Sequence, residues 1–146
     1  MAGDFFALVE KHFRFLKERG MLATRTDCNP NFFGNAFVEY QGKDCSVRVV
    51  RDRGQILVDV GPPRTDTGDS ATYEWIGIAS AVSYIEATKR RPVVDFSASE
   101  AAQIEQAASF VRRNLDALCS AISQVGWSHF EAEVRRYFGD PRYTVS

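Results

Sequence analysis

The sequence predicts an α+β fold: an N-terminal helix, an antiparallel meander of three to four strands, and then three helices packed on one face of the sheet. Three segments between positions 36 and 61 alternate apolar and polar residues and are separated by polar turns. The residues before and after them follow the 3–4 spacing of helices. Runs of strands followed by runs of helices indicate α+β rather than a wound parallel sheet. The 146 residues are predicted to form a single domain, 1–146.

The first helix is predicted from Asp4 to Arg19. Its apolar stripe comprises Phe6, Val9, Phe13 and Leu16, widened by Phe5 and Leu8. Asp4 is expected to be the N-cap, and Gly20 to end the helix in the left-handed conformation. The stretch MLATRT, from Met21 to Thr26, suits a first strand, and the polar run at 27–35 predicts a loop.

The meander is predicted from strands at 37–40, 45–50 and 55–60, joined by turns at 41–44 and 51–54. A four-residue loop at 51–54 would pair Val50 with Gln55 and place apolar residues on one face, with Val49 opposite Ile56 and Val47 opposite Val58. The other, less buried face is expected to carry Glu39, Arg48, Leu57 and Asp59.

A polar loop is predicted at 61–70, followed by three helices. The first begins near Thr72, with a stripe of Trp75, Ile78, Ala79, Val82 and Ile85, and ends at 89–92. The second is the longest and ends at Gly126, with a stripe of Ile104, Ala108, Val111, Leu115, Leu118 and Ile122. Capping boxes are expected at Ser97 with Glu100 and, for the last helix, at Ser128 with Glu131. The simplest packing lays the first and the longest helix on the apolar face.

The sequence carries no signature of catalysis or of metal, cofactor or nucleic-acid binding. The formal net charge is −1, whereas nucleic-acid binders usually carry a basic excess. His12 and His129 belong to no metal-ligand motif, and no GxSxG, GK[ST] or GxGxxG pattern occurs. We therefore expect no cofactor, no metal, no nucleic acid and, in the leading hypothesis, no enzymatic activity.

Three cysteines, Cys28, Cys45 and Cys119, do not suggest a disulfide framework. Cys45 and Cys119 lie at apolar positions, which favours buried free thiols. The chain has neither an apolar run near the roughly 20 residues of a membrane helix nor a secretory signal pattern. A cytoplasmic protein that does not bind membranes is the expectation.

Charges of both signs cluster at the predicted turn 51–54 and in the loop 61–70, where they suit protein recognition. The candidate partner-binding residues are Arg51, Asp52, Arg53, Arg64, Asp66 and Asp69. An ordinary solvated surface is the alternative interpretation of the same charges.

One resemblance bears on function. The order of four segments is similar to that of small bacterial immunity-type proteins, which neutralise polymorphic toxins. These segments are FLKERG, VEYQG, the hairpin at 47–61 and the helix YEWIGIASAV. The resemblance covers roughly the first 85 residues and implies a non-catalytic domain that occludes a partner protein. Two alternatives remain: a homo-oligomeric structural or regulatory domain, and an enzyme with a dispersed active site.

Overall fold

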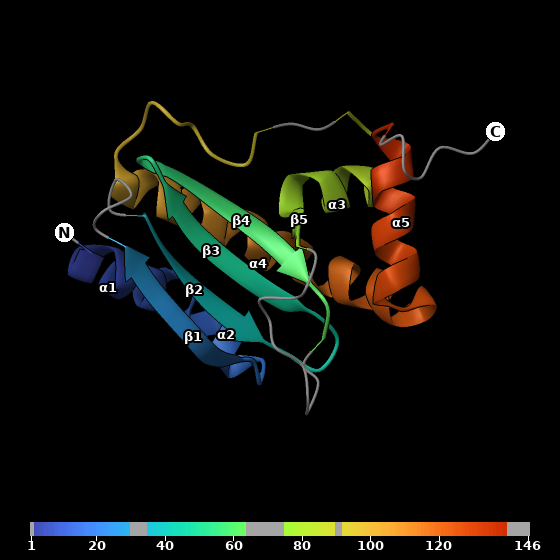
Figure 1. Ribbon diagram of the computed structural model, residues 1–146, viewed down its shortest axis with the longest axis horizontal. Coiled ribbons are helices and arrows are strands. Elements are labelled where there is room, and N and C mark those ends of the chain that lie inside the picture. The colour runs from blue at the N-terminus through green and yellow to red at the C-terminus, as the bar shows by residue number, and fades with distance from the viewer. Residues whose placement is uncertain (1, 30–34, 64–74, 90–91, 140–146) are drawn as a thin grey trace.

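The computed structural model describes residues 2–29, 35–63, 75–89 and 92–139 and confirms the α+β class (Figure 1). Its elements are α1 (Ala2–His12), α2 (Arg14–Glu18), β1 (Leu22–Asn29), β2 (Asn35–Gln41), β3 (Ser46–Asp52), β4 (Gln55–Gly61), β5 (Ile76–Gly77), α3 (Ile78–Glu86), α4 (Glu100–Val125) and α5 (Trp127–Tyr137). No helix within these ranges is long and apolar enough to span a membrane.

The sheet is an antiparallel meander, with the described strands in the order β1-β2-β3-β4-β5. The strand expected from MLATRT is confirmed and runs on to Asn29, so positions 27–29 belong to the strand and not to the predicted loop. Positions 30–34 of that loop lie outside the described residues. A fifth strand, the two-residue β5, was not expected from the sequence. It pairs with the outer edge of β4 at Asp59 and Val60.

The predicted register of the β3–β4 hairpin is wrong by two residues. Asp52 pairs with Gln55, so the loop has two residues rather than four, and Val49 faces Val58 instead of Ile56. Arg53 and Gly54 have φ of 52° and 82°, the positive angles at both central positions that a type I′ turn requires. A shift of two preserves side-chain alternation, so the prediction of which residues face the core is still correct.

The first predicted helix is interrupted at Phe13, which separates α1 from α2. Phe5 is fully buried whereas Phe6 is only partly buried, so the core stripe runs through Phe5 rather than Phe6. The helix already begins at Ala2, which places Asp4 in the first turn and not at the N-cap. A carboxylate there still favours the positive end of the helix dipole.

The helix predicted from Thr72 begins later, at Ile78. Trp75 precedes β5 and packs on Gly61, where an added Cβ would lie 2.6 Å from the indole ring. The stripe predicted for α4 is confirmed, since all six of its residues are buried. Its N-cap is Ser99, whose Oγ accepts the Ala102 N–H at 3.2 Å, so the capping box expected at Ser97 is wrong.

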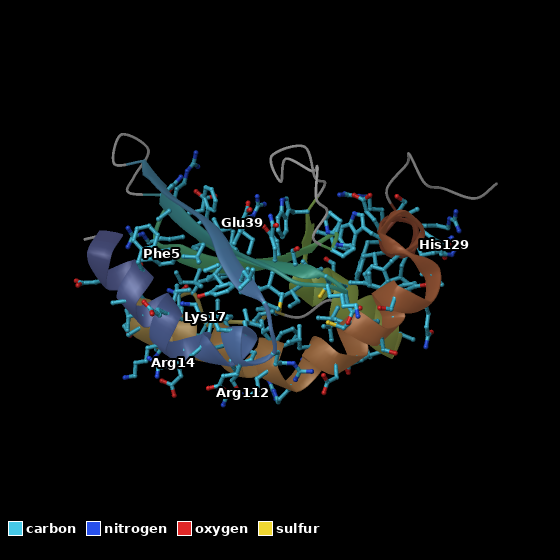
Figure 2. All side chains as sticks on the ribbon, turned by 90° about the horizontal axis from the view of Figure 1, so that it is seen from below. Phe5, Arg14, Lys17, Glu39, Arg112 and His129 are labelled. Atoms are coloured by element: carbon cyan, nitrogen blue, oxygen red, sulfur yellow. The ribbon has the colours of Figure 1, made fainter. Side chains whose placement is uncertain are left out.

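The second capping box is also wrong, because α5 begins directly after Gly126 and has no side-chain cap. The helices α1, α2 and α4 form a layer on one side of the sheet (Figure 2), where α1 packs on β2 and α4 packs on β4 and α1. At the end of the molecule, α5 packs on α3 and α4. We call the side of the sheet away from α1 and α4 the outer face; on β2, β3 and β4 it presents Phe37, Glu39, Arg48, Val50, Leu57 and Asp59.

Candidate functional site

A mostly apolar cleft follows the outer edge of β4, which is the edge that faces away from β3. Its volume is about 470 Å³, and its lining comes from β4, the start of α3 and the segment before α4. We call it the β4 cleft; it is lined by Ile56, Leu57, Val58, Asp59, Gly77, Ile78, Ala79, Ser80, Pro92, Val93, Val94 and Phe96. Its volume lies within the range of roughly 300–1,000 Å³ that is usual for ligand pockets.

The cleft exists because β5 is short. β5 pairs only with Asp59 and Val60, so within the described ranges no strand pairs with the outer edge of β4 from 55 to 58 (Figure 1). Unpaired edges invite pairing with other chains, and proteins commonly protect them. Here the buried Gln103 of α4 accepts the Ile56 N–H at 3.0 Å and donates to the Ala98 carbonyl oxygen at 3.0 Å. This use of the Ile56 N–H leaves the cleft suited to apolar side chains more than to an added strand.

Two large apolar side chains lie exposed at the cleft. Leu57 is 37% exposed and Phe96 is 42% exposed. Leu57 also belongs to the outer face, where it pairs in register with Val50, and Val50 pairs with Phe37. These neighbours are partly buried, so an apolar row runs from β2 across the sheet to the cleft. Exposed apolar surface of this kind is typical of sites that bind other molecules.

Among the described residues that line the cleft, Asp59 is the one ionisable side chain. Its Oδ2 accepts hydrogen bonds from Arg48 Nη2 at 2.9 Å and Nε at 3.3 Å. Burial raises the pKa of Asp59, and the ion pair with Arg48 opposes that shift. The Arg48 guanidinium also lies 4.5 Å from the centre of the Trp75 ring. Arg48 therefore holds this carboxylate in a partly buried ion pair.

Glu39 continues this charged row on the outer face, since it pairs in register with Arg48, and Arg48 pairs with Asp59. Figure 2 shows Glu39 on the side of the sheet away from α1. The face was predicted correctly, but the expected exposure is wrong, because Glu39 is only 1% exposed. Its Oε2 has no hydrogen-bond partner among the described residues.

The charged residues predicted to bind a partner do not share one location in the structure. Arg51 lies in β3 rather than in a turn, and it is 9% exposed. Asp52 ends β3 and Arg53 is the first turn residue; Asn35 of β2 donates to Asp52 Oδ1 at 3.2 Å and accepts the Arg53 N–H at 2.9 Å. Arg64, Asp66 and Asp69 lie outside the described residues.

Arg51 instead connects three elements of the core. Its Nη1 donates to Glu100 Oε1 at 2.8 Å, which joins β3 to the first turn of α4. The guanidinium lies 5.1 Å from the centre of the Phe5 ring in α1. The prediction that Arg51 contacts a partner stays a prediction, but its place in an exposed turn is wrong.

The charged side chains of α5 pair with one another along the helix. Arg135 and Arg136 form ion pairs with Glu131 and Glu133 along α5. His129 is exposed and lies 4.0 Å from Glu133. Within the described ranges, no group of three or more His, Cys, Asp or Glu side chains could hold a metal ion.

Comparison with protein-family models, curated proteins and solved structures gives no match for this chain. The site is therefore interpreted from its own geometry. Sequence reasoning placed Leu57 on the outer face but overlooked Phe96 and Gln103. The sequence does hold a signal for Leu57, which is apolar at a polar position of its strand. It holds one for Gln103 as well, which is polar one turn before the buried Ala107.

Proposed function

We propose that this chain is a non-catalytic protein-binding domain whose β4 cleft takes apolar side chains from a partner protein. The observation that carries the proposal is the pair of exposed apolar side chains, Leu57 and Phe96, on a cleft bordered by an incompletely paired strand. Exposed apolar patches with polar surroundings mark interaction sites in soluble proteins. Asp52 and Arg53, close to the cleft in the same hairpin, supply exposed charges of both signs that would orient the partner.

The chemistry of the cleft supports binding over catalysis. Of the lining residues that the structure describes, Asp59 alone is ionisable, and its carboxylate is held by Arg48. General acid–base or nucleophilic catalysis requires a second group placed to exchange a proton or to orient the first. The lining otherwise offers apolar side chains, a glycine, a proline and the Ser80 hydroxyl.

The narrower proposal is an immunity-type protein that binds a toxin and occludes its working site. It is supported by the order of segments in the first 85 residues, from FLKERG to YEWIGIASAV, and by a binding surface that needs no catalytic group. A homo-oligomeric domain using the same cleft is the second candidate, because an incompletely paired strand edge also favours contact between identical chains.

The test uses tagged wild-type protein and two single variants, Leu57→Asp and Phe96→Asp, in a lysate of the native host. Leu22→Asp is the matched control, because Leu22 is 49% exposed at the start of β1, on the opposite edge of the sheet. We expect one specific partner to be retained by wild type and by the control. Each cleft variant should weaken its affinity at least ~10-fold, as loss of a central apolar contact does. Circular dichroism verifies that all four proteins are folded.

Retention of the partner by all variants, or capture of no specific partner, would refute the proposal. Sedimentation of the purified wild-type protein then tests whether the cleft binds a second copy of the chain instead. If the chain self-associates and Leu57→Asp abolishes this, the occupant is a second copy and the homo-oligomer is correct. For the narrower proposal, the identified partner is produced in cells: wild type and Leu22→Asp should restore growth and Leu57→Asp should not. A partner without toxicity would refute the immunity role alone.

A further inference from the structure

A second cavity, unrelated to the β4 cleft, lies where three segments meet. They are the end of α2, the turn between β2 and β3, and the second half of α4. The cavity has a volume of about 450 Å³ and is lined by Arg19, Met21, Gly42, Lys43, Asp44, Cys45, Leu115, Asp116, Cys119, Ser120 and Ser123. Two of its lining residues are cysteines that lie 74 positions apart in the sequence.

The two thiols lie side by side. Cys45 ends the turn before β3, and Cys119 lies on α4; their Sγ atoms are 3.2 Å apart. A disulfide bond is about 2.05 Å long, so the sulfurs need to approach by only about 1 Å to form one. Both cysteines are free. The pair is therefore positioned to be linked by a small movement of the turn or of the side chains.

The surroundings give the two sulfurs different roles. Cys45 is 1% exposed, whereas Cys119 is partly exposed toward the cavity. The hydrogen bond between the two thiols lowers the pKa of Cys119. The Arg19 charge also lowers it, whereas burial and the Asp44 charge raise it. The same hydrogen bond, together with burial, raises the pKa of Cys45. Cys119 is thus the more accessible thiol of the pair and the one whose thiolate form is favoured.

Polar contacts hold the segments that carry the pair. Ser123 of α4 donates to Asp44 Oδ1 at 3.1 Å, which ties the turn to the helix one helical turn beyond Cys119. Arg19 forms an ion pair with Asp116, which ties the end of α2 to the same helix. Because both contacts flank the cysteines, the thiols stay close while the cavity remains open to a small molecule.

We propose that Cys45 and Cys119 are a reversible redox site at which a hydroperoxide converts the two thiols into an intramolecular disulfide. The Cys119 thiolate attacks one peroxide oxygen; the S–O bond forms, the O–O bond breaks, and the remaining oxygen leaves as water or an alcohol after taking a proton. Cys45 then attacks the sulfenic sulfur; the S–S bond forms, the S–O bond breaks, and water leaves with the proton of Cys45. The two sulfurs lose two electrons and the peroxide gains them. A dithiol reductant reverses the change by thiol–disulfide exchange.

The test starts from the chain carrying Cys28→Ser, so that the pair supplies its only two thiols. The folded protein is exposed to hydrogen peroxide, its remaining thiols are alkylated, and intact mass and peptide masses are measured. We expect a monomer that has lost two hydrogen atoms, resists alkylation, and yields one cross-linked peptide joining positions 45 and 119. Dithiothreitol should restore both thiols. The cross-link should raise the melting temperature by roughly 10 °C, because it closes a long loop in the unfolded chain.

Two variants test the roles. With Cys45→Ser, Cys119 should accumulate as a sulfenic acid that dimedone traps; with Cys119→Ser, Cys45 should react at least ~10-fold more slowly. Persistence of both free thiols under peroxide, disulfides between two chains instead of within one, or trapping at Cys45 in place of Cys119 would overturn the proposal. If a serine variant does not fold, the peptide map and the reversal by dithiothreitol in the parent protein decide the outcome on their own.

Discussion

Replacing Arg51 by alanine is expected to destabilise the protein rather than to alter an exposed surface. The guanidinium is mostly buried, with 11% of its side chain exposed, and it holds Glu100 at 2.8 Å and the Phe5 ring at 5.1 Å. A hydrogen bond to a charged group contributes about 1.5–3 kcal/mol. The cation–π contact adds about 0.5–1 kcal/mol. Because Glu100 is 31% exposed and regains some hydration, we expect a total loss of about 3 kcal/mol.

The assay is urea denaturation followed by circular dichroism, with a thermal melt in parallel. For a chain of this size, 3 kcal/mol corresponds to a fall in melting temperature of roughly 6–12 °C. Arg53→Ala is the matched control, because Arg53 is the same residue type in the same hairpin and its side chain is 75% exposed. Its unfolding free energy should stay within about 0.5 kcal/mol of wild type.

A double-mutant cycle with Glu100→Ala isolates the ion pair. Substitutions of residues in contact are not additive, and we expect a coupling energy of about 1–2 kcal/mol between Arg51 and Glu100. If Arg51→Ala and Arg53→Ala had the same small effect, or if the cycle showed no coupling, the structural role assigned to Arg51 would be refuted. The exposed-turn interpretation of Arg51 would then regain its support.

Three further predictions concern the hairpin and the outer face. Gly54→Ala should cost about 1 kcal/mol in the unfolding free energy, because φ is 82° there and alanine disfavours that conformation; denaturant midpoints measure it. Gly61→Ala should cost about 1–3 kcal/mol and change the Trp75 fluorescence spectrum, since the new Cβ would meet the indole ring at 2.6 Å. Burial raises the pKa of Asp59, so the folded state binds its proton more tightly than the unfolded state does. Protonated Asp59 therefore adds to the free energy of unfolding below pH 3.8, and this addition is lost as the pH rises through the folded-state pKa. Urea midpoints across that range should show a fall that Asp59→Asn lacks, and parallel curves for the two proteins would contradict it.

The order of elements could be predicted because it depends on local periodicity. The α4 stripe repeats an apolar residue every three or four positions over the whole helix, and the strands at 46–52 and 55–61 alternate with a period of two. The type I′ turn at Arg53-Gly54 was missed because arginine gives no signal for positive φ, whereas Asn or Gly at that position would have. Without that signal the predicted register was wrong by two residues, although the predicted faces of the strands were correct.

The site was harder to predict because it depends on contacts between distant segments. Leu57 and Phe96 lie 39 positions apart and line one cleft only because β5 is too short to cover the edge of β4. The charges at 51–53 looked equivalent in the sequence, yet Arg51 lies on the core side of its strand and Arg53 at the tip of the turn. Alternation does not distinguish the two arginines, since both continue the phase of Val47 and Val49. They differ because β3 runs through Arg51 and ends at Asp52, whereas the predicted four-residue loop would have placed both in the turn.

The helix α4 supports both proposed sites, and its length keeps them apart. Gln103 accepts the Ile56 N–H at the β4 edge near the start of the helix, and Cys119 lines the second cavity near its end. Sixteen residues of helix rise by about 24 Å, and the described linings of the two cavities share no residue. A disulfide at Cys119 would therefore restrain the turn before β3 without contacting Leu57 or Phe96. Partner affinity at the cleft and peroxide sensitivity at the thiols thus depend on different side chains, so that either proposal can be refuted while the other stands.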